Sequence, residues 1–174
     1  MHSHGPGRDV RIAAEMASPR CVVTRGSQHL DFLLVRIAGD RVGLPLRGVL
    51  ETMRPPPCSP LQGAAPWVLG VSVIRGTPTP VVDLGRALGR DVAGSPSERQ
   101  RVVTVHAGER TVALAVDEVL GIRRVLASSL QALPPLLDPG DRLVEALGVL
   151  DEQLLLVLRE GRLLPDDAVP PGGT

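Results

Sequence analysis

Arg75 is the charged residue whose setting most suggests a specific contact. It stands at an Arg-Gly-Thr-Pro turn within the stretch Trp67–Leu88, after an apolar run that ends at Ile74 and before a second one at Val81 and Val82. A guanidinium stays charged in proteins and presents its donors in a rigid fork. At a tight turn between apolar strands it therefore needs a carboxylate or carbonyl partner, either within this protein or on another one.

The residues that could perform nucleophilic catalysis or bind a metal are isolated. His106 is the only histidine after the start of the first predicted strand, and Cys58 lies among prolines with no histidine nearby. A catalytic nucleophile needs a base beside it. Cys21 and Cys58 are too few for a disulfide framework, and His2 and His4 have no cysteine or carboxylate cluster to complete a metal site. We expect no catalytic residue, no metal and no cofactor.

The acidic residues are also dispersed along the sequence. Glu51 ends a predicted strand, Asp117 and Glu118 follow another one, and Asp83 stands before a short predicted helix. A general acid and base would require two of these carboxyl groups close together in a cleft. Their spacing favours one helix cap and a few solvent-exposed strand ends.

The composition excludes several classes of function. The 174 residues include nineteen Lys and Arg, all of them Arg, against nineteen Asp and Glu, so lysine-based catalysis is excluded and the net charge is zero. A balanced charge gives no electrostatic reason to bind nucleic acid. With one Phe, one Trp and no Tyr, the core must be aliphatic. No apolar run approaches the roughly 20 residues that span a bilayer, and no secretory signal is evident. We expect a cytoplasmic protein that does not insert into the membrane.

Short strands are predicted to position these residues. The sequence from Asp31 to Met53 predicts a strand, a tight turn at Gly39-Asp40 and a second strand bent at Pro45. The proline-rich segment that follows, 54–66, predicts a connecting loop because proline suits neither a helix nor a central strand.

The stretch Trp67–Leu88 predicts two strands followed by a short helix. Asp83 stands at the N-cap position of this helix, before the spacing of Leu84 and Leu88. Pro78 and Pro80 each remove a backbone donor from the second strand. That strand is therefore predicted to be an edge strand or a bulged strand.

The second half of the chain repeats the first in three blocks that keep their order. Each block alone is a weak match, but the order indicates a duplicated unit. The pairs of blocks are Ala38–Leu50 with Ala107–Leu120, the Leu-Gly-Val at Leu69 with that at Leu147, and Val81–Leu88 with Val157–Leu164. We predict tails at 1–29 and 166–174 and one domain at 30–165. It comprises two pseudo-repeated β lobes, roughly 30–90 and 100–165, of the size of small barrels.

Four segments together resemble the CheW-like coupling proteins of bacterial chemosensory systems. They are DFLLVRIAGDRVGLPLRGVLE, APWVLGVSVIRGTPTPVVDLGRAL, VVTVHAGERTVALAVDEVLGI and ALGVLDEQLLLVLREGRLL. The resemblance implies a mostly β fold of two five-stranded SH3-like barrels, with short helices, on a shared aliphatic core. It also implies a non-enzymatic adaptor at membrane-associated receptor arrays. Its partners would be the cytoplasmic tip of a chemoreceptor (a methyl-accepting protein) and the regulatory domain of a CheA-type histidine kinase.

The resemblance also implies which residues contact these partners. They lie on the predicted strands and at the Arg-Gly turn, and comprise Val49, Glu51, Val71, Ile74, Arg75, Gly76, Val102, Val119 and Ile122. Many family members carry Asn where this chain has Val73. Arg75 has two interpretations of equal weight: it braces its turn by bonding Glu51 or a carbonyl, or it contacts a partner.

Three alternatives remain open from the sequence. The adaptor could serve a non-flagellar pathway, such as motility by pili or gene regulation, instead of flagellar chemotaxis. The same surface could act on an unrelated kinase or regulator. A small enzyme could use a cleft between the lobes through Glu51, Arg75 and His106, and it would require a deep polar pocket.

Overall fold

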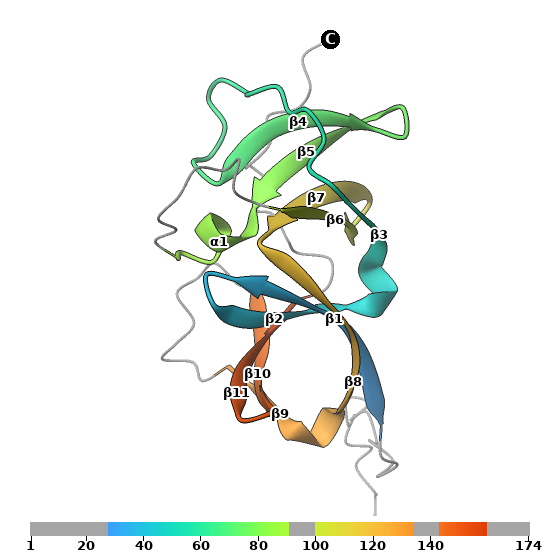
Figure 1. The fold of residues 1–174 in the computed structure, drawn as a ribbon, viewed down its shortest axis with the longest axis vertical. Coiled ribbons are helices and arrows are strands. Elements are labelled where there is room, and N and C mark those ends of the chain that lie inside the picture. The colour runs from blue at the N-terminus through green and yellow to red at the C-terminus, as the bar shows by residue number, and fades with distance from the viewer. Residues whose placement is uncertain (1–27, 91–99, 134–142, 160–174) are drawn as a thin grey trace, which may run out of the picture.

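The computed structural model describes residues 28–90, 100–133 and 143–159, whose strands form two sheets (Figure 1). The six-stranded sheet has the order β8-β1-β2-β11-β10-β9, and the five-stranded sheet has the order β3-β6-β7-β5-β4. In chain order the elements are β1 (His29–Ile37), β2 (Asp40–Pro45), η1 (Leu46–Gly48), β3 (Val49–Met53), β4 (Val68–Ile74), β5 (Thr77–Asp83), α1 (Leu84–Ala87), β6 (Arg101–Ala107), β7 (Arg110–Val116), β8 (Glu118–Leu126), η3 (Ala127–Ser129), β9 (Leu130–Ala132), β10 (Val144–Leu150) and β11 (Gln153–Leu158). The predicted mostly β fold is confirmed.

Each sheet combines strands from both halves of the chain. The β1–β2 hairpin pairs antiparallel with β8 and parallel with β11, whereas the β6–β7 hairpin pairs antiparallel with β3 and parallel with β5. The same set of pairings thus occurs twice. The sheets do not follow the predicted lobes, 30–90 and 100–165, because the strand after each hairpin crosses into the other sheet, so that the two halves exchange their hairpins.

The six-stranded sheet has one strand more than the prediction of five. After η3 the chain turns back along β10, where Leu130 pairs with Gly148 and Ala132 pairs with Ala146. The sheet curls around its own interior in the lower part of Figure 1. The predicted tails, 1–29 and 166–174, lie outside the described residues except at positions 28 and 29, and β1 begins at His29.

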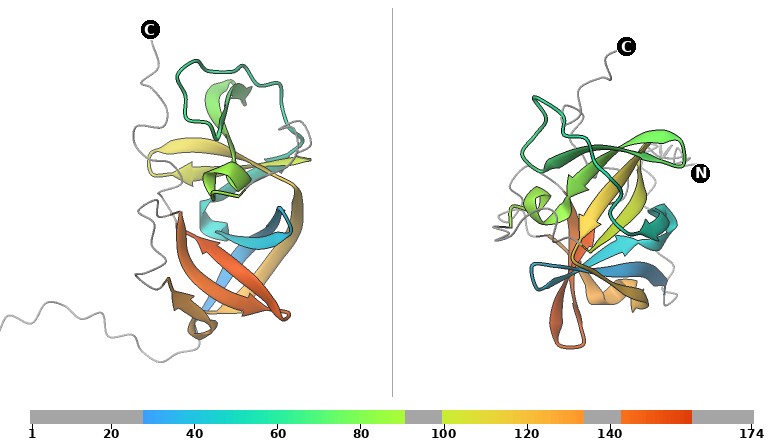
Figure 2. Two further views of the ribbon diagram at one scale, coloured as in Figure 1. Left: turned by 90° about the vertical axis from the view of Figure 1, so that its left-hand side faces the viewer. Right: turned by 45° about the horizontal axis from the view of Figure 1, so that its top comes forward.

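The main core is aliphatic, as the composition predicts, and lies between the two sheets. Both sheets contribute to it, and α1 lies between them in the turned views (Figure 2). Burying one such side chain contributes roughly 1.5–3 kcal/mol. Fully buried members are Val35, Ile37, Val42, Leu44, Val82, Leu84, Val103, Val112, Leu114, Val116 and Leu158. A smaller apolar cluster fills the interior of each sheet, one around Phe32 and Leu155 and the other around Val81 and Ala113.

Asp83 caps α1, which confirms the prediction from its position. Its Oδ1 accepts a hydrogen bond from the Arg86 backbone N–H at 3.1 Å, and its own N–H donates to the Trp67 carbonyl at 2.8 Å. The cap matters because Asp83 is 1% exposed, where a polar group without partners would be destabilising. Leu84, directly after it, is buried in the main core and fixes the helix there.

Pro78 and Pro80 do not make β5 an edge strand, because β5 lies between β4 and β7. Pairing with β7 begins only at Val81, whereas Pro78 and Pro80 stand opposite Val73 and Val71 of β4. In this two-residue hairpin the prolines occupy pairs that exchange no hydrogen bonds. Their nitrogens therefore face the side where β7 has not yet begun, and no ladder bond is lost.

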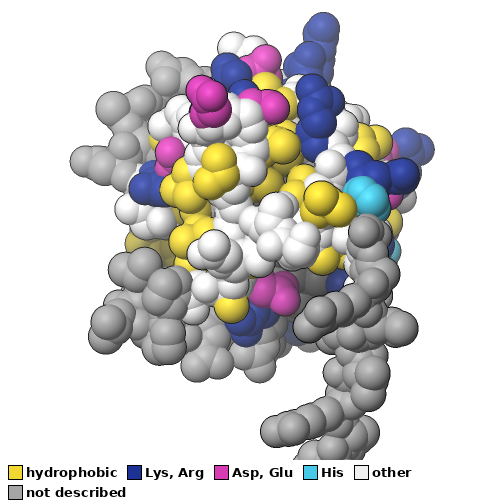
Figure 3. Space-filling view, turned by 90° about the horizontal axis from the view of Figure 1, so that it is seen from below, with side chains coloured by type: hydrophobic (Ala, Val, Ile, Leu, Met, Phe, Trp, Pro, Cys, Tyr) yellow, Lys and Arg dark blue, Asp and Glu magenta, His cyan; other side chains and the backbone are white. Residues whose placement is uncertain are grey.

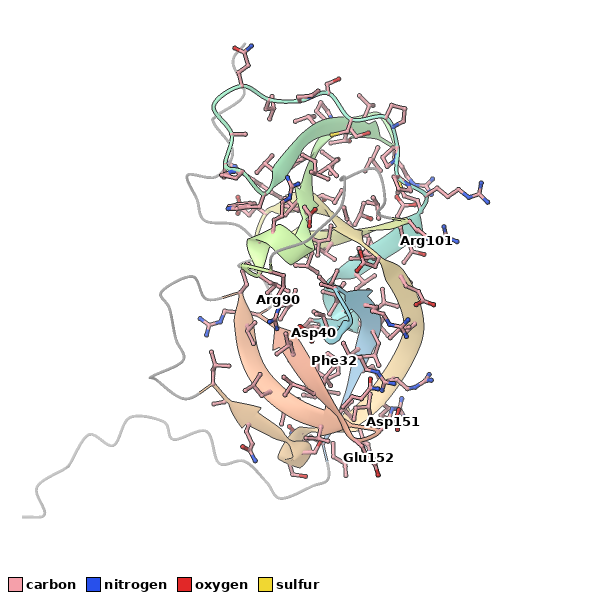
Figure 4. The ribbon with its side chains drawn as sticks, turned by 60° about the vertical axis from the view of Figure 1, so that its left-hand side comes forward. Phe32, Asp40, Arg90, Arg101, Asp151 and Glu152 are labelled. Atoms are coloured by element: carbon pink, nitrogen blue, oxygen red, sulfur yellow. The ribbon has the colours of Figure 1, made fainter. Side chains whose placement is uncertain are left out.

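Polar contacts fix the crossings between the sheets. Figure 4 shows Arg90, after α1, beside Asp40 at the start of β2, with 2.7 Å between Nη2 and Oδ2. At the crossing from β7 to β8, the Asp117 N–H donates to the Arg36 carbonyl at 3.1 Å, and its Oδ2 accepts from the Ala38 N–H at 2.7 Å. Such exposed contacts contribute little stability, but they orient one sheet on the other.

Candidate partner-binding surface

The turn between β4 and β5 consists of Arg75 and Gly76 alone, since Ile74 pairs with Thr77. Both turn residues have positive φ angles, +50° and +78°. These are the angles of a type I′ turn, which matches the twist of the two strands it joins. Glycine adopts such angles without steric penalty, whereas Arg75 adopts them as a non-glycine residue. The turn leaves the Arg75 side chain 80% exposed.

Glu51 of β3 is the partner of Arg75 within the protein. Its Oε2 lies 2.7 Å from Arg75 Nη2, and its Oε1 and Oε2 lie 3.0 and 3.1 Å from Arg75 Nε. The carboxylate therefore binds the side of the guanidinium that carries Nε and Nη2. Nη1 takes no part in these three bonds and remains on a largely exposed side chain, where a second acceptor could reach it.

This ion pair joins the two edges of the five-stranded sheet. Glu51 lies on β3 and Arg75 at the tip of β4, and these strands are the first and last of the sheet. A bulge in β3, between Val49 and Glu51, shifts the register against β6. Bulges re-aim the side chains beside them, and here the residue re-aimed toward the turn is Glu51. The pair thus bridges the open side of the barrel.

The ion pair shifts the proton affinities of both groups. Its hydrogen bonds hold the pKa of Glu51 below the ordinary glutamate value of 4.5, and the same bonds raise the pKa of Arg75. Bonding to the charged form is the cause in each case. The pair is therefore fully charged at neutral pH.

We expect the ion pair to break only in acid. A carboxyl group whose pKa is lowered by folding contributes stability above its unfolded pKa, and loses it as the pH falls through the folded value. Binding through this surface should thus be constant from about pH 6 to 8. An NMR titration of the Glu51 carboxyl carbon should give a midpoint that rises toward 4.5 in Arg75→Ala. An unchanged midpoint in that variant would show that the pair does not form in solution.

Two of the predicted apolar contact residues, Ile74 and Val102, support this surface from behind, whereas Val71 lies on the other face of β4. Ile74 and Val102 are 8% and 1% exposed and belong to the interior cluster of the five-stranded sheet, and Val71 is half-buried. Ile74 and Val102 therefore offer a partner almost no accessible atoms. We leave these two out of the contact set.

The remaining three predicted apolar residues follow the boundary between the sheets, which we call the seam. Val49 of β3 and Val119 of β8 are half-buried and pack against the same main core. Ile122 stands opposite Leu33 on the neighbouring strand, and 56% of it is exposed. The seam is therefore apolar and partly accessible, in contrast to a polar cleft.

Two exposed apolar residues beside the ion pair are not among the predicted contact residues. Leu50, in the β3 bulge, is 48% exposed, and Val73, two residues before Arg75, is 68% exposed. Between Val71 and Val73 on β4, the Ser72 side chain points inward instead, and its Oγ donates a hydrogen bond to the Pro57 carbonyl at 2.7 Å. The signal in the sequence was the Val-Ser-Val alternation, which places both valines on the face opposite Ser72.

The groups of the enzyme hypothesis are not assembled into a reactive site. His106 is exposed, and among the described residues no hydrogen bond or ion pair connects it to Glu51 or Arg75. Partial burial raises the pKa of the Cys58 thiol, which disfavours the reactive thiolate. The described ranges contain no group of three His, Cys, Asp or Glu able to hold a metal ion. Within those ranges, no helix has the length and hydropathy to cross a membrane.

Comparisons with known proteins agree with this geometry. Residues 31–168 match the family model described as CheW-like domain. Protein FrzA of Myxococcus xanthus is 32% identical over 132 residues, covering 76% of this chain and 80% of FrzA. Chemotaxis protein CheW of Rhizobium meliloti is 29% identical over 125 residues, covering 69% and 80%. The scaffolding protein TtCheW from Thermoanaerobacter tengcongensis superposes with a TM-score of 0.72 at 19% identity, over 82% of this chain and 97% of TtCheW, which supports the fold.

Proposed function

This chain belongs to the CheW-like domain family, and from that premise we propose that it couples the cytoplasmic tips of chemoreceptors to a CheA-type histidine kinase. The relatives include chemotaxis protein CheW and protein FrzA, and TtCheW is described as a scaffolding protein, which together support a scaffold role in chemotaxis or another chemosensory pathway. The observation that carries the proposal is an exposed ion pair, Glu51–Arg75, together with an apolar and partly open seam.

The receptor tip is proposed to bind along the seam. A helical tip presents an apolar stripe, which suits a shallow apolar groove better than a polar pocket would. Val49, Val119 and Ile122 are the apolar side chains proposed to contact the tip. Arg75 Nη1 is directed to an acceptor on the tip, while Nε and Nη2 stay bonded to Glu51. Apolar burial then supplies affinity, and the arginine supplies orientation.

The kinase regulatory domain is proposed to bind elsewhere on the chain, at the hairpin of β10 and β11. There Val149 and Leu154 stand opposite each other, 68% and 52% exposed. A cross-strand apolar pair left in solvent is a typical interaction site. Asp151 and Glu152, labelled in Figure 4, form the turn beside this pair. Separate surfaces allow receptor and kinase to bind the same molecule at once.

Reciprocal arginine substitutions test this division. Ile122→Arg should weaken capture of a purified receptor cytoplasmic fragment at least about tenfold while leaving capture of the kinase regulatory domain unchanged. Val149→Arg, its matched control, should do the opposite. Both residues are largely exposed, so neither change should unfold the protein. Val49→Arg should weaken receptor binding as well, because it places a charge in the seam. Undiminished receptor capture by both Ile122→Arg and Val49→Arg would dismiss the seam.

The proposed coupling role also implies a cellular location and a signalling pathway. We propose that the protein acts at membrane-associated receptor arrays in the cytoplasm. Its pathway is flagellar chemotaxis or a non-flagellar system such as pili motility or gene regulation. Val73 supports a partner with an apolar group at this position, since it exposes an aliphatic side chain where the resemblance leads one to expect Asn.

A further inference from the structure

The interior of the six-stranded sheet is open at one end. A pocket of about 440 Å³ lies there, within the size range of ligand-binding cavities. Its floor is part of the apolar cluster inside this sheet, formed by Phe32, Leu130, Ala146 and Val157. Seen from below, this end of the molecule exposes hydrophobic side chains among charged ones (Figure 3). At the opposite end of β2, Arg41 closes the interior by donating from Nη1 to the Leu150 carbonyl at 3.3 Å.

The chain enters the fold at the rim of this pocket. The Gln28 carbonyl accepts a hydrogen bond from the Ala127 N–H at 2.9 Å, which fixes the entry point against η3. The next residues of β1, from His29 to Phe32, all line the pocket, and Leu30 is 40% exposed there. Any segment directly before Gln28 is therefore held at high effective concentration beside this apolar pocket.

The sequence before Gln28 has the chemistry to fill this site. Val22 and Val23 form an apolar β-branched pair, followed by Arg25 and Gly26. The five residue-to-residue steps from Val23 to Gln28 can span at most about 17 Å, and glycine permits the reversal that a return toward the pocket requires. The rim carries the exposed carboxylate of Glu145, opposite in charge to Arg25.

We propose that residues 20–25 dock in this pocket, with Val22 and Val23 on its apolar floor and Arg25 at Glu145. The occupant is thus a segment of the same chain, bound in cis. This docking is independent of the receptor and the kinase. It replaces, for these six residues, the expectation of a tail without contacts.

The native Cys21 allows a direct test in the full chain. With Cys58 replaced by Ser, a nitroxide attached to Cys21 should broaden the NMR signals of Leu130, Ala146 and Val157, which are distant from the label in sequence. Val22→Glu together with Val23→Glu should remove this broadening, whereas the matched control Val10→Glu with Ile12→Glu should retain it. Broadening confined to residues adjacent to Cys21 in sequence, or broadening that persists in the Val22/Val23 variant, would overturn the proposal.

A mixing experiment shows whether the segment in the pocket comes from the same chain or from a second copy. Isotope-labelled protein without nitroxide is mixed with unlabelled protein that carries it. Docking in cis predicts no broadening of Leu130, Ala146 or Val157 in this mixture. Broadening of these signals in the mixture would mean that a second copy supplies the segment, which also overturns the proposal.

Discussion

Arg75→Ala is expected to lower the affinity for a receptor cytoplasmic fragment by at least about tenfold, while the melting temperature remains nearly unchanged. The side chain is 80% exposed, and exposed ion pairs contribute little to folding. Receptor binding depends on Arg75 more strongly than folding does. Without this arginine, an acceptor on the receptor would be buried in the interface without its charged donor. Isothermal titration calorimetry and thermal denaturation of the same samples measure the two effects.

A charge exchange decides between the two interpretations of this arginine. In the double variant Glu51→Arg with Arg75→Glu, the ion pair can form again with its charges reversed. If Arg75 acts through Nη1 on the partner, the exchange does not restore binding. Restored binding, or unfolding of Arg75→Ala, would instead show that the guanidinium only braces the turn against Glu51.

Gly70→Ala is expected to destabilise the fold by about 3 kcal/mol, which corresponds to a fall of roughly 6–12 °C in melting temperature. Gly70 has a φ of +143°, and an added Cβ would lie 2.1 Å from the Ser59 carbonyl oxygen. The loop would have to move away from β4. It would then lose two hydrogen bonds of 2.9 Å between Ser59 and Val71.

Gly63→Ala is the matched control in the same loop. Gly63 also has a positive φ, +76°, but an added Cβ would meet nothing within 4 Å. This change should therefore show backbone strain alone, on the order of 1 kcal/mol. Chemical denaturation of both variants measures the difference. Equal losses would contradict the account, because the close approach of Ser59 to Gly70 would then contribute nothing.

The local structure could be predicted from the sequence because its causes are local. The Arg75–Gly76 turn follows from a glycine between two apolar runs, and the cap of α1 follows from the position of Asp83. The aliphatic core follows from the near absence of aromatic residues. Each of these features depends on a few neighbouring positions.

The pairing of the sheets could not be predicted in the same way. Which sheet a hairpin joins is decided by the parallel contacts of β2 with β11 and of β5 with β7, far apart in the sequence. Nothing in the composition of the β1–β2 hairpin distinguishes the neighbours of its own half from those of the other half. The duplication could therefore be predicted from the sequence, whereas the exchange of hairpins could not.

The prediction of the contact residues was incomplete for a different reason. Strand residues alternate between two faces, so a stretch such as Val-Ser-Val-Ile has two possible orientations. Ile74 is predicted to face a partner, but the buried Ser72 hydroxyl donates to the Pro57 carbonyl of the loop. Ile74 therefore points inward with Ser72, and Val73 is exposed. Only the loop at 54–66, packed against β4, settles this choice.

Co-purification from the native cell tests the central claim most directly. The tagged full chain is isolated beside Arg75→Ala, and bound proteins are identified by mass spectrometry. The account predicts that a CheA-type kinase and a chemoreceptor accompany the unaltered chain, and that the variant keeps the kinase but loses the receptor. Isolation of the unaltered chain with neither protein enriched over an untagged control would contradict it.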